Sequence, residues 1–184
     1  MREKVVAIAV SDLHLSHTPP IARTAEPDWY EAQLRPLKQL RAAQSKYNAP
    51  ILYAGDIFDK PNQPPELVNF AIKNLPAGVA VPGQHDLPGH NYADRFKSAY
   101  GTLVLAGVLN DIVPTMEFTY TQLKGLAIHP FPWGEKIKKR VRVDGRINIA
   151  LIHKYAWIPK RSYEGAEASE KMSSHVKNLV GWCD

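Results

Sequence analysis

Short apolar runs that each end in a polar cluster recur along this chain. Residues 5–10, 50–54 and 78–82 are apolar throughout and run directly into the clusters SDLHLS, GDIFD and GQHD, while the mostly apolar residues 147–152 run into HKY. Runs of this length without polar alternation are typical of strands buried on both faces of a sheet. We therefore predict four such strands, each with polar residues at its carboxyl end.

Helical patterns separate these strands. Residues 27–47 carry Leu34, Leu37 and Leu40 at helical spacing, with Pro36 as an irregularity, and residues 65–75 and 91–100 predict two shorter helices. Strands that alternate with helices are the pattern of an α/β sheet.

A change of pattern follows between residues 102 and 129, where short apolar pieces are separated by Gly and Asn-Asp. The segments EFTYTQL and GLAIHPF, at residues 117–123 and 125–131, predict antiparallel strands of a second sheet or of an extension. No linker or internal repeat interrupts the chain, so we expect a single domain over residues 1–184.

Composition narrows the class of protein. The longest early apolar stretch, residues 5–10, is too short for a membrane span or the core of a secretory signal, and the lone Cys183 cannot form an internal disulfide. These features predict a soluble, cytoplasmic protein without a membrane partner.

The formal net charge is +5 and the pI about 9.3. The basic run between Lys136 and Arg142 suits a polyanion, although a solvated strand edge is the plainer alternative.

The polar clusters predict a shared site. In open α/β sheets the loops that leave the carboxyl ends of the strands meet at one rim, where ligands bind. Asp12, Asp56, Gln84 and His153 all follow predicted strands. Residues far apart in the sequence are therefore expected to converge in space.

Asp12 and His14 offer a carboxylate and an imidazole two residues apart. In an extended loop such residues point the same way and can bind one cation. The pair taken alone is also compatible with a loop carboxylate beside a surface histidine. Asp56 follows Gly55 and can present two oxygens, as a carboxylate that bridges two metals must, with capping of a helix as its alternative. Asp59 is expected to cap a turn or support a ligand.

The cluster at residues 83–86 combines three different functions. Gln84 brings a neutral amide ligand, His85 can transfer a proton near neutral pH, and Asp86 could fix the orientation of that histidine. A polar turn capped by Asp86 is the alternative. His153, at the end of the fourth strand, is a candidate metal ligand, although a single histidine there is more often structural.

The series SDLH, GDIFD, GQHD and His153 resembles the calcineurin-like metallophosphoesterase superfamily over residues 11–153, and its GDIFD and PGQHDLP motifs are closest to SbcD-type DNA repair nuclease subunits. The resemblance implies a four-layer α/β/β/α sandwich with a dimetal site. Asp12 and His14 would bind the first metal, Asp56 would bridge, and Gln84 and His153 would bind the second. Gln84 replaces the usual Asn. No Gly-His-x-His follows His153 in the printed sequence, so we expect the fold to be incomplete at its C-terminus.

The expected cofactors are two divalent cations. Carboxylate, amide and imidazole ligands suit Mn²⁺, with Mg²⁺, Fe or Zn²⁺ possible. Two cations would activate a bridging hydroxide for attack on phosphorus. His85, oriented by Asp86, is the candidate for protonating the leaving group or stabilising the transition state.

The expected substrate is DNA, cleaved as a phosphodiester. Tyr155, Trp157, Lys160 and Arg161 could stack a base and follow a nucleic-acid backbone, or the two aromatic rings could pack on the sheet edge instead. The resemblance also suggests an SMC-like ATPase partner and a homodimer. Two alternatives stay open. One is a phosphomonoesterase or small-nucleotide phosphodiesterase on the same scaffold, and the other is a non-catalytic binding module that has lost its metal.

Overall fold

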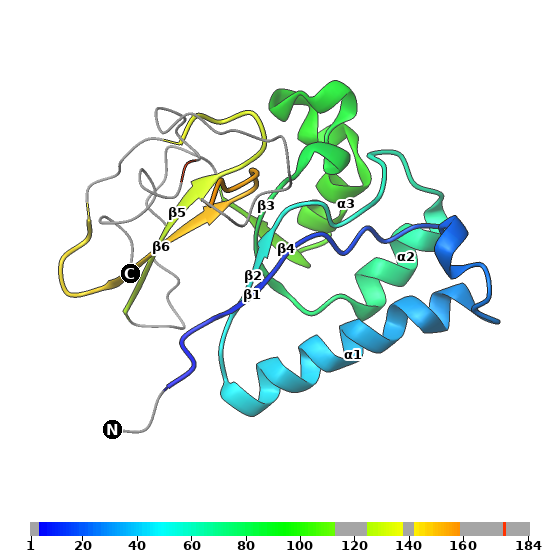
Figure 1. Cartoon of the computed structure of the whole chain (residues 1–184), viewed down its shortest axis with the longest axis horizontal. Coiled ribbons are helices and arrows are strands. Elements are labelled where there is room, and N and C mark those ends of the chain that lie inside the picture. The colour runs from blue at the N-terminus through cyan, green and yellow to red at the C-terminus, as the bar shows by residue number, and fades with distance from the viewer. Residues whose placement is uncertain (1–3, 113–124, 138–141, 159–174, 176–184) are drawn as a thin grey trace.

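Four parallel strands form the main sheet of the computed structural model, which describes residues 4–112, 125–137, 142–158 and 175 (Figure 1). Three of these strands were predicted from the sequence. The fourth, at residues 109–111, was missed because Asn110 and Asp111 look like turn residues. The strands lie in the order β1 (Ile8–Val10), β2 (Ile51–Ala54), β3 (Gly78–Val81) and β4 (Leu109–Asp111).

Three α-helices pack against one face of this sheet. They are α1 (Trp29–Tyr47), α2 (Pro65–Asn74) and α3 (Ala99–Leu105). Helix α1 begins where the Asp28 carboxylate accepts the Glu31 N–H at 3.0 Å, and it ends at Asn48, whose left-handed φ of 47° breaks the helical path. Within the described ranges, four short 3₁₀-helices accompany them, at Ile21–Arg23, Gln84–Asp86, Pro88–His90 and Tyr92–Lys97.

The single helix predicted for residues 91–100 was wrong. The chain instead forms the 3₁₀-helix Tyr92–Lys97 and then starts α3 at Ala99. Ser98 separates the two because its hydroxyl accepts the Gly101 N–H at 3.3 Å and so caps α3.

A second, two-stranded sheet covers the other face of the main sheet. It consists of β5 (Leu126–Phe131) and β6 (Ile147–Ile152). Along β2, Ile51 and Tyr53 belong to the core beneath the helices, whereas Leu52 packs in the second core with residues of the two-stranded sheet. This alternation is the reason why β2 is apolar at every position.

The strand predicted at residues 125–131 is confirmed as β5, and its partner among the described residues is β6. β5 and β6 run parallel, with partners from Leu126 and Ile147 through to Phe131 and Ile152. The predicted strand at residues 117–123 lies outside the described residues. The mixed α/β class is confirmed, and the described ranges show three of the four expected layers: helices, main sheet and second sheet (Figure 1). None of the helices in these ranges has the length and apolar character needed to cross a bilayer.

Candidate metal centre

The loops after β1 and β2 run side by side at the rim of the main sheet. The Asp12 N–H donates to the Gly55 carbonyl and the His14 N–H to the Asp56 carbonyl, both at 3.1 Å. Asp12, His14 and Asp56 all have positive φ, at 57°, 44° and 54°. The extended loop predicted for residues 12–14 was therefore wrong. A left-handed backbone brings the Asp12 Oδ1 and His14 Nε2 atoms to 3.6 Å instead, at a conformational cost typical of functional sites.

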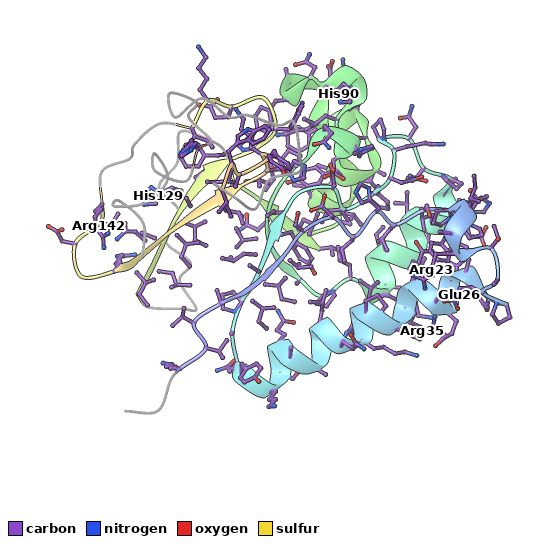
Figure 2. All side chains as sticks on the ribbon, viewed as in Figure 1. Arg23, Glu26, Arg35, His90, His129 and Arg142 are labelled. Atoms are coloured by element: carbon purple, nitrogen blue, oxygen red, sulfur yellow. The ribbon has the colours of Figure 1, made fainter. Side chains whose placement is uncertain are left out.

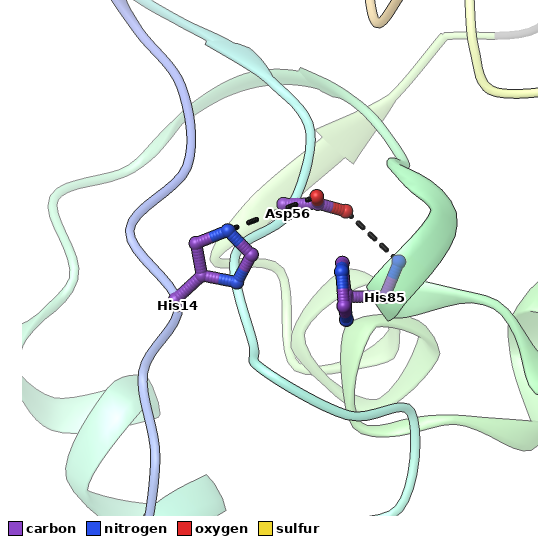
Figure 3. A group of neighbouring side chains, drawn as sticks. All are labelled: His14, Asp56 and His85. Carbon is purple, nitrogen blue, oxygen red and sulfur yellow. Dashed lines mark hydrogen bonds and ion pairs between the residues drawn. The ribbon is translucent and has the colours of Figure 1, made fainter. Parts of the chain in front are cut away.

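Asp56 lies at the centre of the site and is fully buried. Its Oδ1 accepts the His85 backbone N–H at 2.9 Å (Figure 3). Its buried Oδ2 has no hydrogen-bond donor in the described structure, with His153 Nε2 at 3.3 Å and His14 Nε2 at 3.9 Å. Burial works to raise the pKa of Asp56, but His153 and the His85 amide outweigh it and hold the pKa below its ordinary value.

His153 reaches this point from the second sheet, because β6 ends beside the carboxyl end of β2. Its Nδ1 contacts the Ala54 carbonyl, which can only accept, so Nδ1 carries a proton and, in the neutral ring, Nε2 presents its lone pair. That Nε2 lies 2.8 Å from the Gln84 amide oxygen. Burial works to lower the pKa of His153, but the neighbouring Asp56 carboxylate and Ala54 carbonyl raise it above its ordinary value.

Three atoms with lone pairs therefore converge: Asp56 Oδ2, Gln84 Oε1 and His153 Nε2. Such a cluster is stable only with a shared cation, either a proton or a metal ion. Two sets of ligand atoms lie within 4.8 Å of one another, and they have Asp56 in common. One set is His14, Asp56 and His85; the other is Asp12, Asp56 and His153. The donor types and the shared carboxylate fit a pair of divalent cations.

Two glycines allow this close approach. A Cβ at Gly55, whose φ is +91°, would lie 2.3 Å from His153 Nδ1, and a Cβ at Gly83 would lie 2.1 Å from Asp56 Oδ1. Both values are far below van der Waals contact. The glycines of the GDIFD and GQHD clusters are thus needed to let His153 and Asp56 occupy their positions.

The predicted pairing of Asp86 with the His85 ring was wrong. The fully buried Asp86 carboxylate accepts the N–H groups of Gly83 at 3.0 Å, Phe58 at 3.1 Å and Ile57 at 3.3 Å. It ties the GQHD loop to the GDIFD loop. Burial raises its pKa to about 6 against the opposing effect of these amides. The His85 Nδ1 instead lies 2.9 Å from the Asp59 carbonyl, which fixes the ring.

Two cavities flank the site. The α1 cavity, of about 430 Å³, opens between the site and helix α1, and His14, His85 and Asp59 contribute to its wall. The Trp133 cavity, of about 440 Å³, includes Asp12, Gln84, Trp133, Lys154 and Tyr155, together with His153. The sequence reasoning missed Trp133, although its position just after β5 is again a strand end.

The predicted substrate contacts are only partly described. Tyr155 is half exposed, and its ring lies 4.7 Å from the Trp157 ring between centroids, in a T-shaped arrangement. The two rings thus contact each other, which fits both the stacking and the packing interpretation. Lys160 and Arg161 lie outside the described residues.

The other histidines make contacts at the surface or in the packed interior. His17 contacts the Tyr30 hydroxyl at 2.9 Å, and His90 contacts the Gln84 carbonyl at 3.0 Å. His129 is buried, with Nε2 at 3.1 Å from Asn148 Oδ1. His175 is buried and forms an isolated bridge with Trp157. None of them belongs to the metal-competent sets found among the described residues.

Comparison with known proteins agrees with this geometry. The family model for the calcineurin-like phosphoesterases matches residues 6–176, which is most of the chain and includes every strand and helix described above. A search of curated proteins found no significant match. The matched range contains all the residues that converge at the rim. This chain therefore belongs to the calcineurin-like phosphoesterase family.

Proposed function

We propose that this protein is a phosphodiesterase that cleaves DNA and uses two divalent cations, Mn²⁺ foremost. Family membership supports the more general statement that the protein is a metal-dependent hydrolase of phosphate esters. The nuclease activity, the DNA substrate and the choice of manganese are our proposals.

The observation that carries the proposal is the convergence of the buried Asp56 Oδ2 and the Gln84 Oε1 on His153 Nε2, at 3.3 Å and 2.8 Å, a cluster that needs a shared cation. A protein that had lost its metal would gain stability by replacing such a cluster with apolar side chains. Its presence argues against the non-catalytic binding module. When bound, two divalent cations supply an activated water and offset negative charge on the phosphoryl oxygens.

His85 is the residue we assign to proton transfer. The Asp59 carbonyl holds its Nδ1–H, so Nε2 is the atom left to exchange a proton with the leaving oxygen. The ring lies 5.0 Å from the His14 ring between centroids, at an interplanar angle of 81°, within the metal-competent set of His14, Asp56 and His85 (Figure 3). Asp86 acts indirectly, because it positions the backbone of both loops.

Charge supports a polyanionic substrate. The chain carries a net +5, and Lys136 and Arg142 of the basic run are exposed. Lys154 and Tyr155 line the Trp133 cavity beside the site, where an adjacent phosphate group and a base of the DNA substrate could bind. The SMC-like ATPase partner and the homodimer stay predictions.

Cleavage assays test the proposal. With Mn²⁺, we expect the protein to degrade single- or double-stranded DNA and to hydrolyse bis(p-nitrophenyl) phosphate faster than p-nitrophenyl phosphate. The Asp56→Ala variant should be inactive on all of them. Turnover of the monoester alone would show that the protein is a phosphatase and would refute the nuclease proposal.

A further inference from the structure

The α1 cavity opens beside the metal-competent set of His14, Asp56 and His85. His14, His85 and Asp59 form its inner end, and residues of α1 and of the loop before it form the walls. Its volume of about 430 Å³ lies in the range of small-molecule sites, which are usually about 300–1,000 Å³.

Hydrogen bonds fix one wall of this cavity. The buried Gln33 amide accepts the Ser16 N–H at 2.8 Å and donates to the Ser16 carbonyl at 3.0 Å. The Trp29 indole N–H donates to the same carbonyl at 2.9 Å. The Trp29 ring is therefore held in one orientation on the cavity wall before any ligand arrives.

Ion pairs between side chains also fix the outer rim of the α1 cavity. The Glu26 carboxylate accepts from Arg23 at 2.7 Å and from Arg35 at 2.8 Å, and these three side chains gather beside the start of α1 (Figure 2). The Arg23 guanidinium lies 5.6 Å from the Trp29 ring centroid and also lines the cavity. A planar ligand would thus meet an aromatic ring and a guanidinium, which both favour stacking.

A proline within helix α1 leaves one backbone carbonyl of a lining residue without its helical donor. Ala32 and Pro36 both line the cavity, and Pro36 has no N–H to donate to the carbonyl of Ala32 four residues earlier. That carbonyl is left without its usual helical donor. Apolar and polar groups in one enclosed space suit a heterocyclic ring better than an alkyl chain.

We propose that the α1 cavity binds the leaving-group side of the substrate, as an uncharged ring of nucleoside size that stacks against Trp29. This inference rests on the proposed phosphodiesterase function, because it places the leaving oxygen next to His85, the residue assigned to its protonation. The Trp133 cavity, on the Asp12 and His153 side, would then receive the substituent that stays on phosphorus.

Nucleoside binding without metal tests this inference apart from catalysis. Adenosine is titrated calorimetrically into metal-free protein, with ribose as the control ligand. Thr18→Trp and Pro20→Trp each place a large side chain at the exposed rim of the cavity. Ala25→Trp, on the same exposed loop but outside the cavity, is the matched control. Thermal unfolding checks that all variants fold.

We expect adenosine to bind the wild type and Ala25→Trp equally, and ribose to bind neither. The rim variants should lose affinity by about tenfold or more, since base stacking on an aromatic side chain is worth roughly 1–3 kcal/mol. Absence of adenosine binding, or equal binding by the rim variants, would overturn the inference and leave phosphodiester hydrolysis untouched. Loss of the proposed function would appear separately, as failure to hydrolyse any diester with Mn²⁺.

Discussion

Replacing Gly83 by alanine should displace the Asp56 carboxylate without straining the backbone. Gly83 has φ −93° and ψ −177°, an extended conformation that alanine adopts freely. The new Cβ would lie 2.1 Å from Asp56 Oδ1, whereas ordinary contact begins at 3.4 Å, so one of the two atoms must move by 1.3 Å (3.4 − 2.1). The effect is therefore steric and is directed at Asp56.

Both stability and metal binding should respond. Overpacking of this kind costs roughly 1–3 kcal/mol of unfolding free energy. A shift of Asp56 also weakens the 2.9 Å hydrogen bond from the His85 N–H, and disturbed support of a metal ligand lowers affinity by about 10- to 100-fold. Urea unfolding measures the first quantity, and calorimetric titration with Mn²⁺ measures the second.

Gly89→Ala is the matched control. No heavy atom lies within 4 Å of a Cβ at Gly89, but its φ of +57° makes alanine strained by about 1–2 kcal/mol. This variant should lose stability and keep its Mn²⁺ affinity. Our reasoning fails if Gly83→Ala binds Mn²⁺ as the wild type does, or if Gly89→Ala weakens binding to the same degree.

Three further predictions concern the charged groups of the site. Asp56→Asn, which keeps the shape but removes the charge, should weaken Mn²⁺ binding by more than about 100-fold in the same titration. Asp86→Asn should lower the unfolding free energy by about 1–3 kcal/mol in urea, because its single acceptor oxygen cannot serve all three backbone amides. Mn²⁺ affinity should rise as the pH rises through the raised pKa of His153. At pH values below that pKa, a proton on the ring competes with the metal. Affinity that does not vary between pH 6 and 8, within about twofold, would contradict the last expectation.

The sequence alone was enough to predict that the candidate metal ligands meet at one rim, because buried parallel strands are apolar throughout and the loops after them share that rim. Asp12, Asp56, Gln84 and His153 do converge. The sequence could not show that His153 comes from a second sheet, nor that this sheet is parallel, since the same apolar run fits either pairing.

The role of Asp86 shows a different limit. Adjacent residues in a motif suggest contact, and the order His-Asp suggests that the carboxylate orients the imidazole. In the 3₁₀-helix Gln84–Asp86 the two side chains diverge, so Asp86 turns inward to backbone amides and His85 finds the Asp59 carbonyl. Deciding between these partners requires the backbone path, which depends on Gly83 and on contacts some 26 residues apart.

Backbone strain, absent Cβ atoms and unsatisfied acceptors all coincide within this site. Asp12, His14 and Asp56 itself have positive φ, and two glycines leave Asp56 room. Each feature alone would be a cost to stability, and none improves the packing of the core. Together they bring Asp56 Oδ2 and His153 Nε2 to 3.3 Å, a separation that requires a proton or a metal ion between the two atoms. The local cost in stability is therefore explained by function and not by packing of the core. For this reason we assign catalysis to the rim of the sheet and not to the fold as a whole.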